Sequence, residues 1–265
     1  MSSNPIGVFD SGIGGLTVVK EVLKELPSEN IIYLGDTARI PYGTRSKEVI
    51  KKFALELTSF LLKRKVKFLV VACNTISSTC LDAIKQMSPV PVLGVIKSAA
   101  KEAAGKTKTN VIGIIGTEAT ISSKSYEKEI KRINPKAKII TRACPLFVSL
   151  AEEGLINGEA TKLIAEEYLK TFKKSNVDTL ILGCTHFPIL KKVIQRVVGE
   201  NVLLIDTAHP TALRLKEILT KENLLNGKTN VKHEFYVTDA PDRVYKVAAT
   251  FLGSTLNGKL KKIDI

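Results

Sequence analysis

The sequence contains little of what a base-stacking or membrane-spanning protein needs. Tryptophan is absent, histidine occurs 3 times and aromatic residues make up 6% of the 265 residues, which argues against a surface that stacks nucleic-acid bases. No apolar run approaches the roughly 20 residues that cross a bilayer. The N-terminal apolar stretch is short and has no basic flank, so it does not predict a signal peptide. We therefore expect a cytoplasmic protein that does not associate with membranes.

Cysteine is scarce and irregularly spaced, at positions 73, 80, 144 and 184. In a reducing compartment each thiol is either a small core residue or a reactive group, since structural disulfides are rare there. No C-x-x-C pair occurs, and Cys184 with His186 does not by itself define a zinc site. We expect neither disulfides nor a metal.

Acidic residues are outnumbered, 26 Asp and Glu against 40 Lys and Arg, which gives a net charge of +14. The lysines are spread over expected helix faces, as at Lys47, Lys51 and Lys63, and are not clustered on one recognition element. We interpret this as a solvated basic surface that also steers acidic substrates toward the protein. A basic nucleic-acid-associated protein with a degenerate site is the alternative from another class.

Short β-branched runs alternate with amphipathic helical patterns along the chain. The expected strands are 6–9, 31–34, 68–72, 92–96, 111–115, 138–141, 179–182 and 202–205, and the expected helices are 16–26, 46–65, 158–174, 213–219 and one around 244–251. This order predicts an α/β fold of mostly parallel sheets with helices on both faces.

Two pairs of segments suggest an internal duplication. Residues 68–75 match 179–186 at an offset of 111, and residues 91–96 match 201–206 at an offset of 110. We predict two pseudo-symmetric α/β domains, residues 1–97 with 208–265 and residues 98–207, with the active site in the cleft between them. The segment from His209 on is too short for a third domain, so we expect it to return to the first.

Polar groups follow four expected strands, at the carboxyl ends where open parallel sheets bind ligands. They are Asp10-Ser11, Cys73-Asn74-Thr75, Thr117 and Cys184-Thr185-His186. Cys73 and Cys184 follow equivalent strands of the two halves, so facing halves would bring both thiols into one cleft from opposite sides. Such a pair suits the inversion of an α-carbon, because one thiolate can remove a proton from one face while the other thiol delivers one to the opposite face.

The two thiols have neighbours that can tune them. A free cysteine has a pKa of about 8.5, so both protonation states are accessible near neutrality. Asp10 lies on the first side and His186 on the second, and Glu152 or Glu153 can orient His186. The α-proton of an amino acid is weakly acidic, so the site must stabilise the carbanion by hydrogen bonds and water exclusion.

The glycine-rich segment 10–15 has a competing interpretation as a dinucleotide fingerprint, with Asp36 ending the next strand. Thr17 stands where the third glycine is required, and Asp10 places a carboxylate where the pyrophosphate would lie. A hydrolase based on Cys184 and His186 is a further alternative, but it leaves the matched Cys73 unexplained. No lysine stands out as a Schiff-base residue for pyridoxal phosphate.

Five motifs resemble the glutamate racemases of the aspartate/glutamate racemase superfamily, and the resemblance covers nearly the whole chain. They are GVFDSGIGG at 7–15, GDTARIPYG at 35–43, ACNT at 72–75, GTEAT at 116–120 and GCTHFP at 183–188. The chain departs from the common pattern at Lys97-Ser98, where many members have Glu-Pro, and at Ser149, where proline is common.

The resemblance implies roles for particular residues. It implies that Cys73 and Cys184 are the acid/base pair and that Asp10, Glu152 and His186 assist them. The implied substrate-binding residues are Asp10, Ser11, Pro41, Tyr42, Gly43, Asn74, Thr75, Thr117, Thr120, Thr185 and His186. It further implies glutamate as substrate, no cofactor, a homodimer, and a role in supplying D-glutamate for peptidoglycan. An aspartate or broad-specificity racemase of the same superfamily is the nearest alternative.

Overall fold

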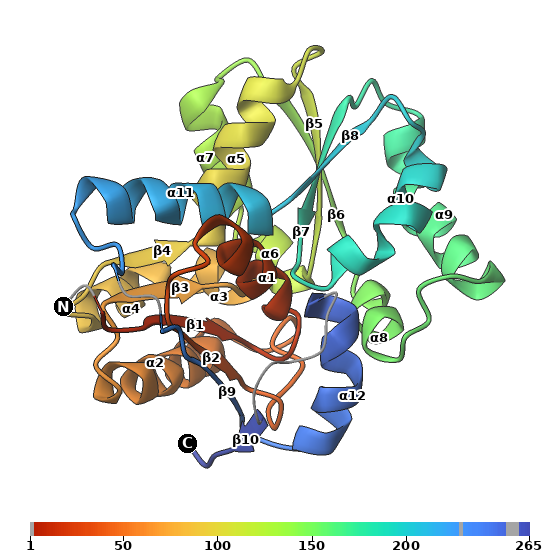
Figure 1. The fold of residues 1–265 in the computed structure, drawn as a ribbon. Coiled ribbons are helices and arrows are strands. Elements are labelled where there is room, and N and C mark those ends of the chain that lie inside the picture. The colour runs from red at the N-terminus through yellow and green to blue at the C-terminus, as the bar shows by residue number, and fades with distance from the viewer. Residues whose placement is uncertain (1–2, 228–229, 253–259) are drawn as a thin grey trace.

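Two parallel sheets form the framework of the protein, for which a computed structural model describes residues 3–227, 230–252 and 260–265. The first sheet has the strand order β10-β9-β2-β1-β3-β4 and the second β6-β5-β7-β8. The strand pairs within them are parallel, and Figure 1 shows one sheet above the other with helices around both. The strands are β1 (Ile6–Asp10), β2 (Ile31–Gly35), β3 (Phe68–Val71), β4 (Val92–Gly94), β5 (Val111–Gly116), β6 (Lys138–Ala143), β7 (Thr179–Gly183), β8 (Leu203–Asp206), β9 (His233–Val237) and β10 (Leu260–Lys262).

Helices connect successive strands and cover the sheets, which confirms the predicted α/β class. They are α1 (Leu16–Glu25), α2 (Lys47–Lys63), α3 (Asn74–Thr79), α4 (Leu81–Met87), α5 (Val95–Lys106), α6 (Glu118–Ser122), α7 (Ser125–Ile133), α8 (Leu146–Glu152), α9 (Glu159–Lys173), the 3₁₀ turn η1 (Phe187–Leu190), α10 (Lys191–Val198), α11 (Ala208–Lys221) and α12 (Pro241–Leu252).

The two sheets share one topology. The order β2-β1-β3-β4 in the first sheet corresponds to β6-β5-β7-β8 in the second, so β3 and β7 occupy equivalent places. The segments that match at an offset of 111 residues contain these two strands. The C-terminal part of the chain returns to the first sheet, because β9 pairs with β2 and β10 pairs with β9. The predicted domain limits fall inside α5 and at the start of α11, and the division into domains stays a prediction.

The predicted strand 92–96 is wrong in its second half, where β4 ends at Gly94 and α5 begins at Val95. Val95 and Ile96 are buried in the helix, and a short buried apolar run has the same pattern in a strand and in a helix. The predicted helix 213–219 is part of the longer α11, whose first turn contains Pro210. Proline is tolerated there because the first helical N–H groups have no intrahelical acceptor.

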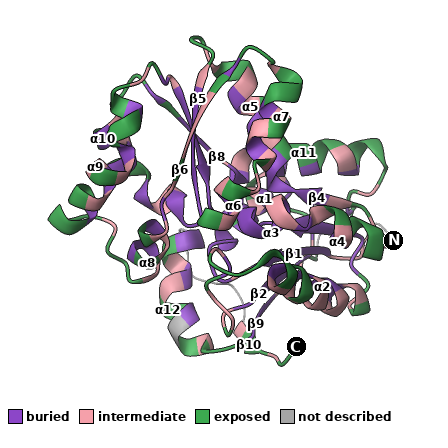
Figure 2. Ribbon diagram, turned by 180° about the vertical axis from the view of Figure 1, so that it is seen from behind, coloured by how far each residue is buried: buried purple, intermediate pink, exposed green. Residues whose placement is uncertain are grey.

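Alternating strand residues divide the core into layers. In β1, Val8 belongs to the cluster that includes α1, α5 and α11, whereas Phe9 belongs to the cluster formed with α2 and α3. The first of these clusters continues into the second sheet through Ile114 and Ile181, so one apolar layer joins the two halves. Figure 2 shows the buried strands between helices whose outer faces are exposed.

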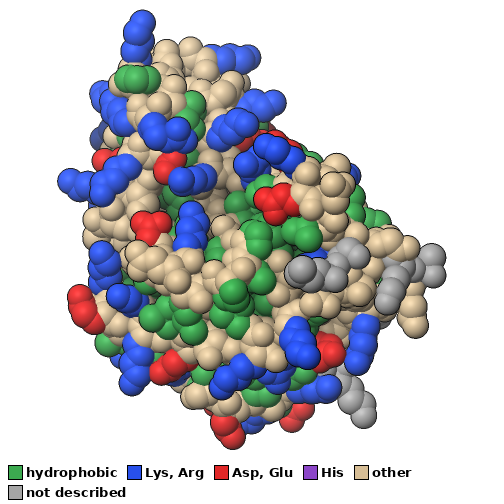
Figure 3. All heavy atoms as spheres, turned by 90° about the vertical axis from the view of Figure 1, so that its left-hand side faces the viewer, with side chains coloured by type: hydrophobic (Ala, Val, Ile, Leu, Met, Phe, Trp, Pro, Cys, Tyr) green, Lys and Arg blue, Asp and Glu red, His purple; other side chains and the backbone are tan. Residues whose placement is uncertain are grey.

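The basic residues are dispersed over the surface. Figure 3 shows Lys and Arg side chains scattered over one face with acidic side chains between them, and not gathered in one stripe. Among the described helices, none combines the length and apolarity that crossing a bilayer requires.

Candidate active site

Asp10 lies at the carboxyl end of β1 and is fully buried. Its Oδ2 accepts a hydrogen bond from the N–H of Gly12 at 3.0 Å, and its Oδ1 accepts one from the hydroxyl of Thr185 at 3.5 Å. Burial raises the pKa of Asp10, while the nearby His186 and the N–H groups of Gly15 and Gly12 limit the rise. Asp10 therefore connects the ends of β1 and β7, strands of different sheets.

The glycines after Asp10 are required by close packing. A Cβ atom on Gly14 would lie 2.4 Å from Oγ1 of Thr185 and 2.6 Å from Nδ1 of His186, and one on Gly15 would lie 2.5 Å from Cβ of Asp10. The loop is thus filled by protein atoms at the place where a dinucleotide fingerprint would hold pyrophosphate. This packing disfavours the dinucleotide interpretation.

Cys73 follows β3 and is the residue before α3, with its side chain buried. Its Sγ lies 3.3 Å from Oγ of Ser11. Burial and, to a smaller extent, the Asp10 carboxylate raise the pKa of the Cys73 thiol to about 12, although hydrogen bonds with Ser11 and the N–H of Ile76 oppose the rise. Cys73 is therefore a thiol in the resting protein.

Cys184 follows β7, at the place in the second sheet that corresponds to Cys73. Its Sγ lies 3.7 Å from Nδ1 of His186, and Nε2 of His186 lies 3.1 Å from Oε1 of Glu152. Burial alone would lower the pKa of His186, but hydrogen bonds and ionic attraction from Cys184 and Glu152 raise it to about 10. The second thiol therefore has an imidazolium beside it, and Glu152, not Glu153, makes the contact with that imidazolium.

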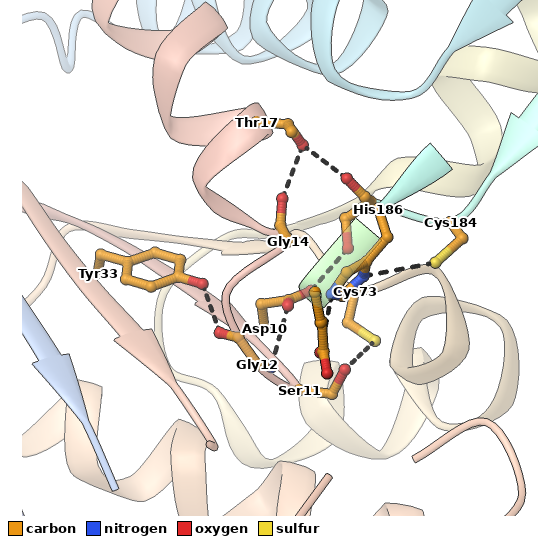
Figure 4. Close-up of polar contacts among 11 residues, drawn as sticks. Asp10, Ser11, Gly12, Gly14, Thr17, Tyr33, Cys73, Cys184 and His186 are labelled. Carbon is orange, nitrogen blue, oxygen red and sulfur yellow. Dashed lines mark hydrogen bonds and ion pairs between the residues drawn. The ribbon is translucent and has the colours of Figure 1, made fainter. Parts of the chain in front are cut away.

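Both thiols are directed toward the same region between the strand ends. Figure 4 shows the sulfur atoms of Cys73 and Cys184 with Asp10, Ser11 and His186 around them. The two sulfur atoms are close enough for a charge on Cys184 to raise the pKa of Cys73. The residues Cys73 and Cys184 are 4% and 6% exposed, so bulk water has little access to them.

Threonine and asparagine side chains join the two halves next to the thiols. The hydroxyl of Thr75 lies 2.9 Å from that of Thr117 and 3.4 Å from that of Thr120. Tyr126 donates a hydrogen bond of 2.6 Å to Oδ1 of Asn74. Asn74 and Thr75 belong to α3 of the first half, whereas Thr117, Thr120 and Tyr126 belong to the second half. Predicted binding side chains from the two halves are therefore in contact.

The segment that contains Tyr42 and Gly43 reaches across to the second half. The carbonyl of Gly43 accepts a hydrogen bond of 3.1 Å from the N–H of Ala119, and a Cβ on Gly43 would lie 2.7 Å from Cβ of Thr117. Within the described residues, the N–H groups of Tyr42 and Gly43 donate to no acceptor of the protein. Pro41, the other predicted residue of this segment, is exposed.

Some residues of this region carried no signal in the sequence. Tyr126 lies in an ordinary amphipathic helix, and nothing local indicates that its hydroxyl reaches Asn74. Phe251 lies 5.4 Å, ring centroid to ring centroid, from His186, although α12 is remote in sequence. Asp36 is part of a motif quoted above, yet its burial becomes visible only in the fold.

A cavity of about 930 Å³ borders the site at Gly43 and Ala119. Its lining includes five basic residues, Arg45, Lys47, Lys51, Lys97 and Lys128, and three acidic ones, Asp82, Glu118 and Glu129. Neither Cys73 nor Cys184 lines it. No group of three or more His, Cys, Asp or Glu side chains in the described part of the chain is arranged to hold a metal ion.

Two halves of one topology, each presenting a thiol at the same strand end, define an α/β protein with a pseudo-symmetric site. Residues 6–214 match the family described as Asp/Glu/Hydantoin racemase. A glutamate racemase from Geobacter metallireducens is 50% identical over 252 residues, which cover 95% of this chain and 93% of that protein. A glutamate racemase from Chlorobaculum parvum is 48% identical over 258 residues, with 96% and 94% covered.

Solved structures give the same result. Glutamate racemase from Francisella tularensis in complex with D-glutamate superposes with a TM-score of 0.94 at 41% identity, covering 100% of this chain and 98% of that one. A glutamate racemase isoform from Bacillus anthracis superposes with a TM-score of 0.96 at 38% identity, covering 100% and 99%. The chain belongs to the Asp/Glu/Hydantoin racemase family, and it is an amino-acid racemase, an isomerase.

Proposed function

We propose that the enzyme interconverts L- and D-glutamate without a cofactor, by a two-base transfer of the Cα proton between Cys73 and Cys184. The observation that carries this proposal is the placement of two buried thiols after β3 and β7, equivalent strands of two sheets that face one site. Two such groups on opposite sides of a carbon can remove a proton from one face and return one to the other.

Each thiol has a partner suited to one state of the reaction. The His186 imidazolium, held by Glu152, stabilises a thiolate at Cys184. Asp10 lies on the side of Cys73, where it disfavours a second negative charge. In one direction the Cys184 thiolate takes the Cα proton while the Cys73 thiol donates its own, and in the other direction the roles are exchanged.

The binding groups suit a substrate with two carboxylates. The free N–H groups of Tyr42 and Gly43 can receive the side-chain carboxylate, because backbone N–H groups are strong donors to anions. The Asn74 amide and the hydroxyls of Thr75 and Thr185 can receive the α-carboxylate, while the Asp10 carboxylate can accept from the ammonium group. Ser11, Thr117, Thr120 and His186 complete the proposed substrate-binding set, together with Pro41.

Glutamate as substrate has further support from the relatives. Both curated relatives described above are named glutamate racemase, and the Francisella structure contains D-glutamate. The proposal includes a cytoplasmic homodimer that supplies D-glutamate for peptidoglycan, which rests on the family resemblance. The basic cavity beside Gly43 would favour the approach of an acidic substrate.

The test is to incubate the purified enzyme with L-glutamate and with L-aspartate, and to follow the loss of optical rotation. We expect glutamate to lose its rotation without added pyridoxal phosphate, and aspartate to react far more slowly. A preference for aspartate, or equal rates, would assign the enzyme to the aspartate or broad-specificity alternative. Salt-dependent DNA binding with no turnover of any amino acid would contradict the proposal as a whole.

A further inference from the structure

Asp36 is a fully buried carboxylate that has no part in the proposed proton transfer. It follows β2, and its N–H donates a hydrogen bond of 3.1 Å to the carbonyl of Asp10, so it lies at the same sheet edge as the site. A carboxylate is costly to bury unless it is paired and hydrogen-bonded. The groups that donate hydrogen bonds to the Asp36 carboxylate therefore indicate which part of the structure it holds in place.

Three donors converge on this carboxylate from two segments, the loop after β2 and the end of β9. Oδ2 accepts from Nε of Arg39 at 2.6 Å and also from the hydroxyl of Tyr42. Oδ1 accepts from the hydroxyl of Thr238 at 2.8 Å, and Oγ1 of Thr238 in turn accepts from the N–H of Ala38 at 2.9 Å. Thr238 directly follows β9, so the C-terminal part of the chain helps to hold the segment that leads to the site.

The Arg39 guanidinium is itself fixed. It forms an ion pair with Glu56 of α2, and it lies over the ring of Phe53 at 4.1 Å from the centroid. The ring of Tyr42 packs on the same Phe53, with centroids 5.5 Å apart. Tyr42 is thus held at its ring by Phe53 and at its hydroxyl by Asp36.

The residue after Tyr42 is the one that bridges to the second half. Gly43 accepts from the N–H of Ala119, and it packs so closely on Thr117 that a Cβ would lie 2.7 Å from that side chain. A shift of Tyr42 therefore displaces the two free N–H groups assigned above to the side-chain carboxylate.

We propose that Asp36 is a positioning residue: its buried carboxylate fixes Tyr42, and so sets the Tyr42–Gly43 turn in the geometry that receives the side-chain carboxylate of the substrate. This inference rests on the proposed function, because it needs a substrate with a side-chain carboxylate at that turn. Asp36 does not touch the substrate, so its removal weakens binding more than it slows proton transfer at the thiols.

The first arm of the test compares Asp36→Asn with wild type in steady-state racemisation of L- and D-glutamate. We expect KM to rise about ten- to hundredfold for both enantiomers, as the loss of hydrogen bonds to a charged group implies, while kcat changes by only a few fold. The matched control is Glu29→Gln, which removes another buried carboxylate that precedes β2, at the opposite end of the strand. We expect this control to leave KM at the wild-type value.

The second arm asks whether Asp36 acts through Tyr42. Tyr42→Phe removes only the hydroxyl, so it should raise KM by a similar factor, and Asp36→Asn added to it should raise KM little further. This non-additivity is the signature of two residues that work through one contact. Thr238→Val should raise KM as well, and Thr238→Ser, which keeps the hydroxyl, should restore it.

The outcomes separate the two proposals. If the wild type racemises glutamate but Asp36→Asn keeps the wild-type KM, or if the effects of Asp36→Asn and Tyr42→Phe multiply independently, the role of Asp36 is refuted and the proposed function stands. If Asp36→Asn does not fold, Tyr42→Phe and Thr238→Val decide the question, and unchanged KM values in both would refute the role. A wild type that does not act on glutamate overturns the proposed function and this inference with it.

Discussion

The sulfur of Cys184 lies 3.7 Å from Nδ1 of His186. Cys73, its topological equivalent, instead has its sulfur 3.3 Å from the hydroxyl of Ser11 and the Asp10 carboxylate nearby. A cation therefore faces one thiol and an anion the other. This asymmetry disfavours a thiolate at Cys73, whose pKa is raised by burial and by Asp10.

The asymmetry predicts unequal kinetic constants for the two enantiomers. The enantiomer whose proton Cys73 removes can react only with the minor state, in which Cys73 is the thiolate, so its apparent affinity is reduced by the population of that state. We expect it to show the larger KM. The two enantiomers have equal free energies, so kcat/KM must be equal for both. The enantiomer with the larger KM must therefore also have a kcat that is larger by the same factor. Initial rates from each enantiomer measure this, and equal KM values would contradict the asymmetry.

The Glu152 contact predicts a pH effect. The pKa of His186, raised to about 10, keeps the imidazolium through neutral pH and lets it lose its proton as the pH rises through 10. We expect kcat/KM to fall on that alkaline side. Glu152→Gln removes one of the charges that raise this pKa, so the fall should move to lower pH by about one unit or more. Glu153→Gln, at the next and exposed position, is the control. If the alkaline fall of kcat/KM moved equally in Glu152→Gln and Glu153→Gln, the role of Glu152 would be contradicted.

Gly14 gives a test of close packing in the site. In Gly14→Ala the new methyl group would lie 2.4 Å from Oγ1 of Thr185, so the turn that contains His186 must shift. A displacement of about 1 Å in an active site can cost roughly a hundredfold in rate, and we expect a loss of at least that order. Gly105→Ala is the control, because a Cβ there meets nothing within 4 Å. It should keep the wild-type rate and stabilise α5 by about 0.5–1 kcal/mol. A fully active Gly14→Ala would show that the turn tolerates movement.

Much of the fold and the thiol pair was predictable because both depend on patterns that repeat locally. The alternation of β-branched runs with helices sets the α/β class, and the offset of 111 residues relates Cys73 to Cys184 within the sequence itself. The end of β4 was not predictable, because Val95 and Ile96 are buried in either conformation. Contacts between distant segments, such as Tyr126 with Asn74 or Asp36 with Thr238, depend on how elements pack and leave no mark in the local sequence.

Breaking a buried ion pair that is remote from the site should lower the stability of the protein. Nζ of Lys67 lies 2.6 Å from Oε2 of Glu29, and both side chains are almost wholly buried. Lys67→Met leaves the Glu29 charge buried without this partner, which should lower the free energy of unfolding by about 3–5 kcal/mol. The exposed pair of Lys162 and Glu159 is the control, and Lys162→Met should change stability by less than about 0.5 kcal/mol. Urea denaturation measures both, and equal effects would contradict the account.

The central claim is that two thiols act from opposite faces of one carbon, and proton exchange in D2O tests it most directly. Each Cys→Ser variant should lose racemisation by about 10²–10⁴-fold or more. Each should still exchange the α-proton of one enantiomer, and the two variants should exchange opposite enantiomers. Cys80→Ser, which replaces another buried thiol, should racemise at the wild-type rate. Near-normal racemisation in either Cys73→Ser or Cys184→Ser, or exchange of the same enantiomer in both, would contradict the two-base account.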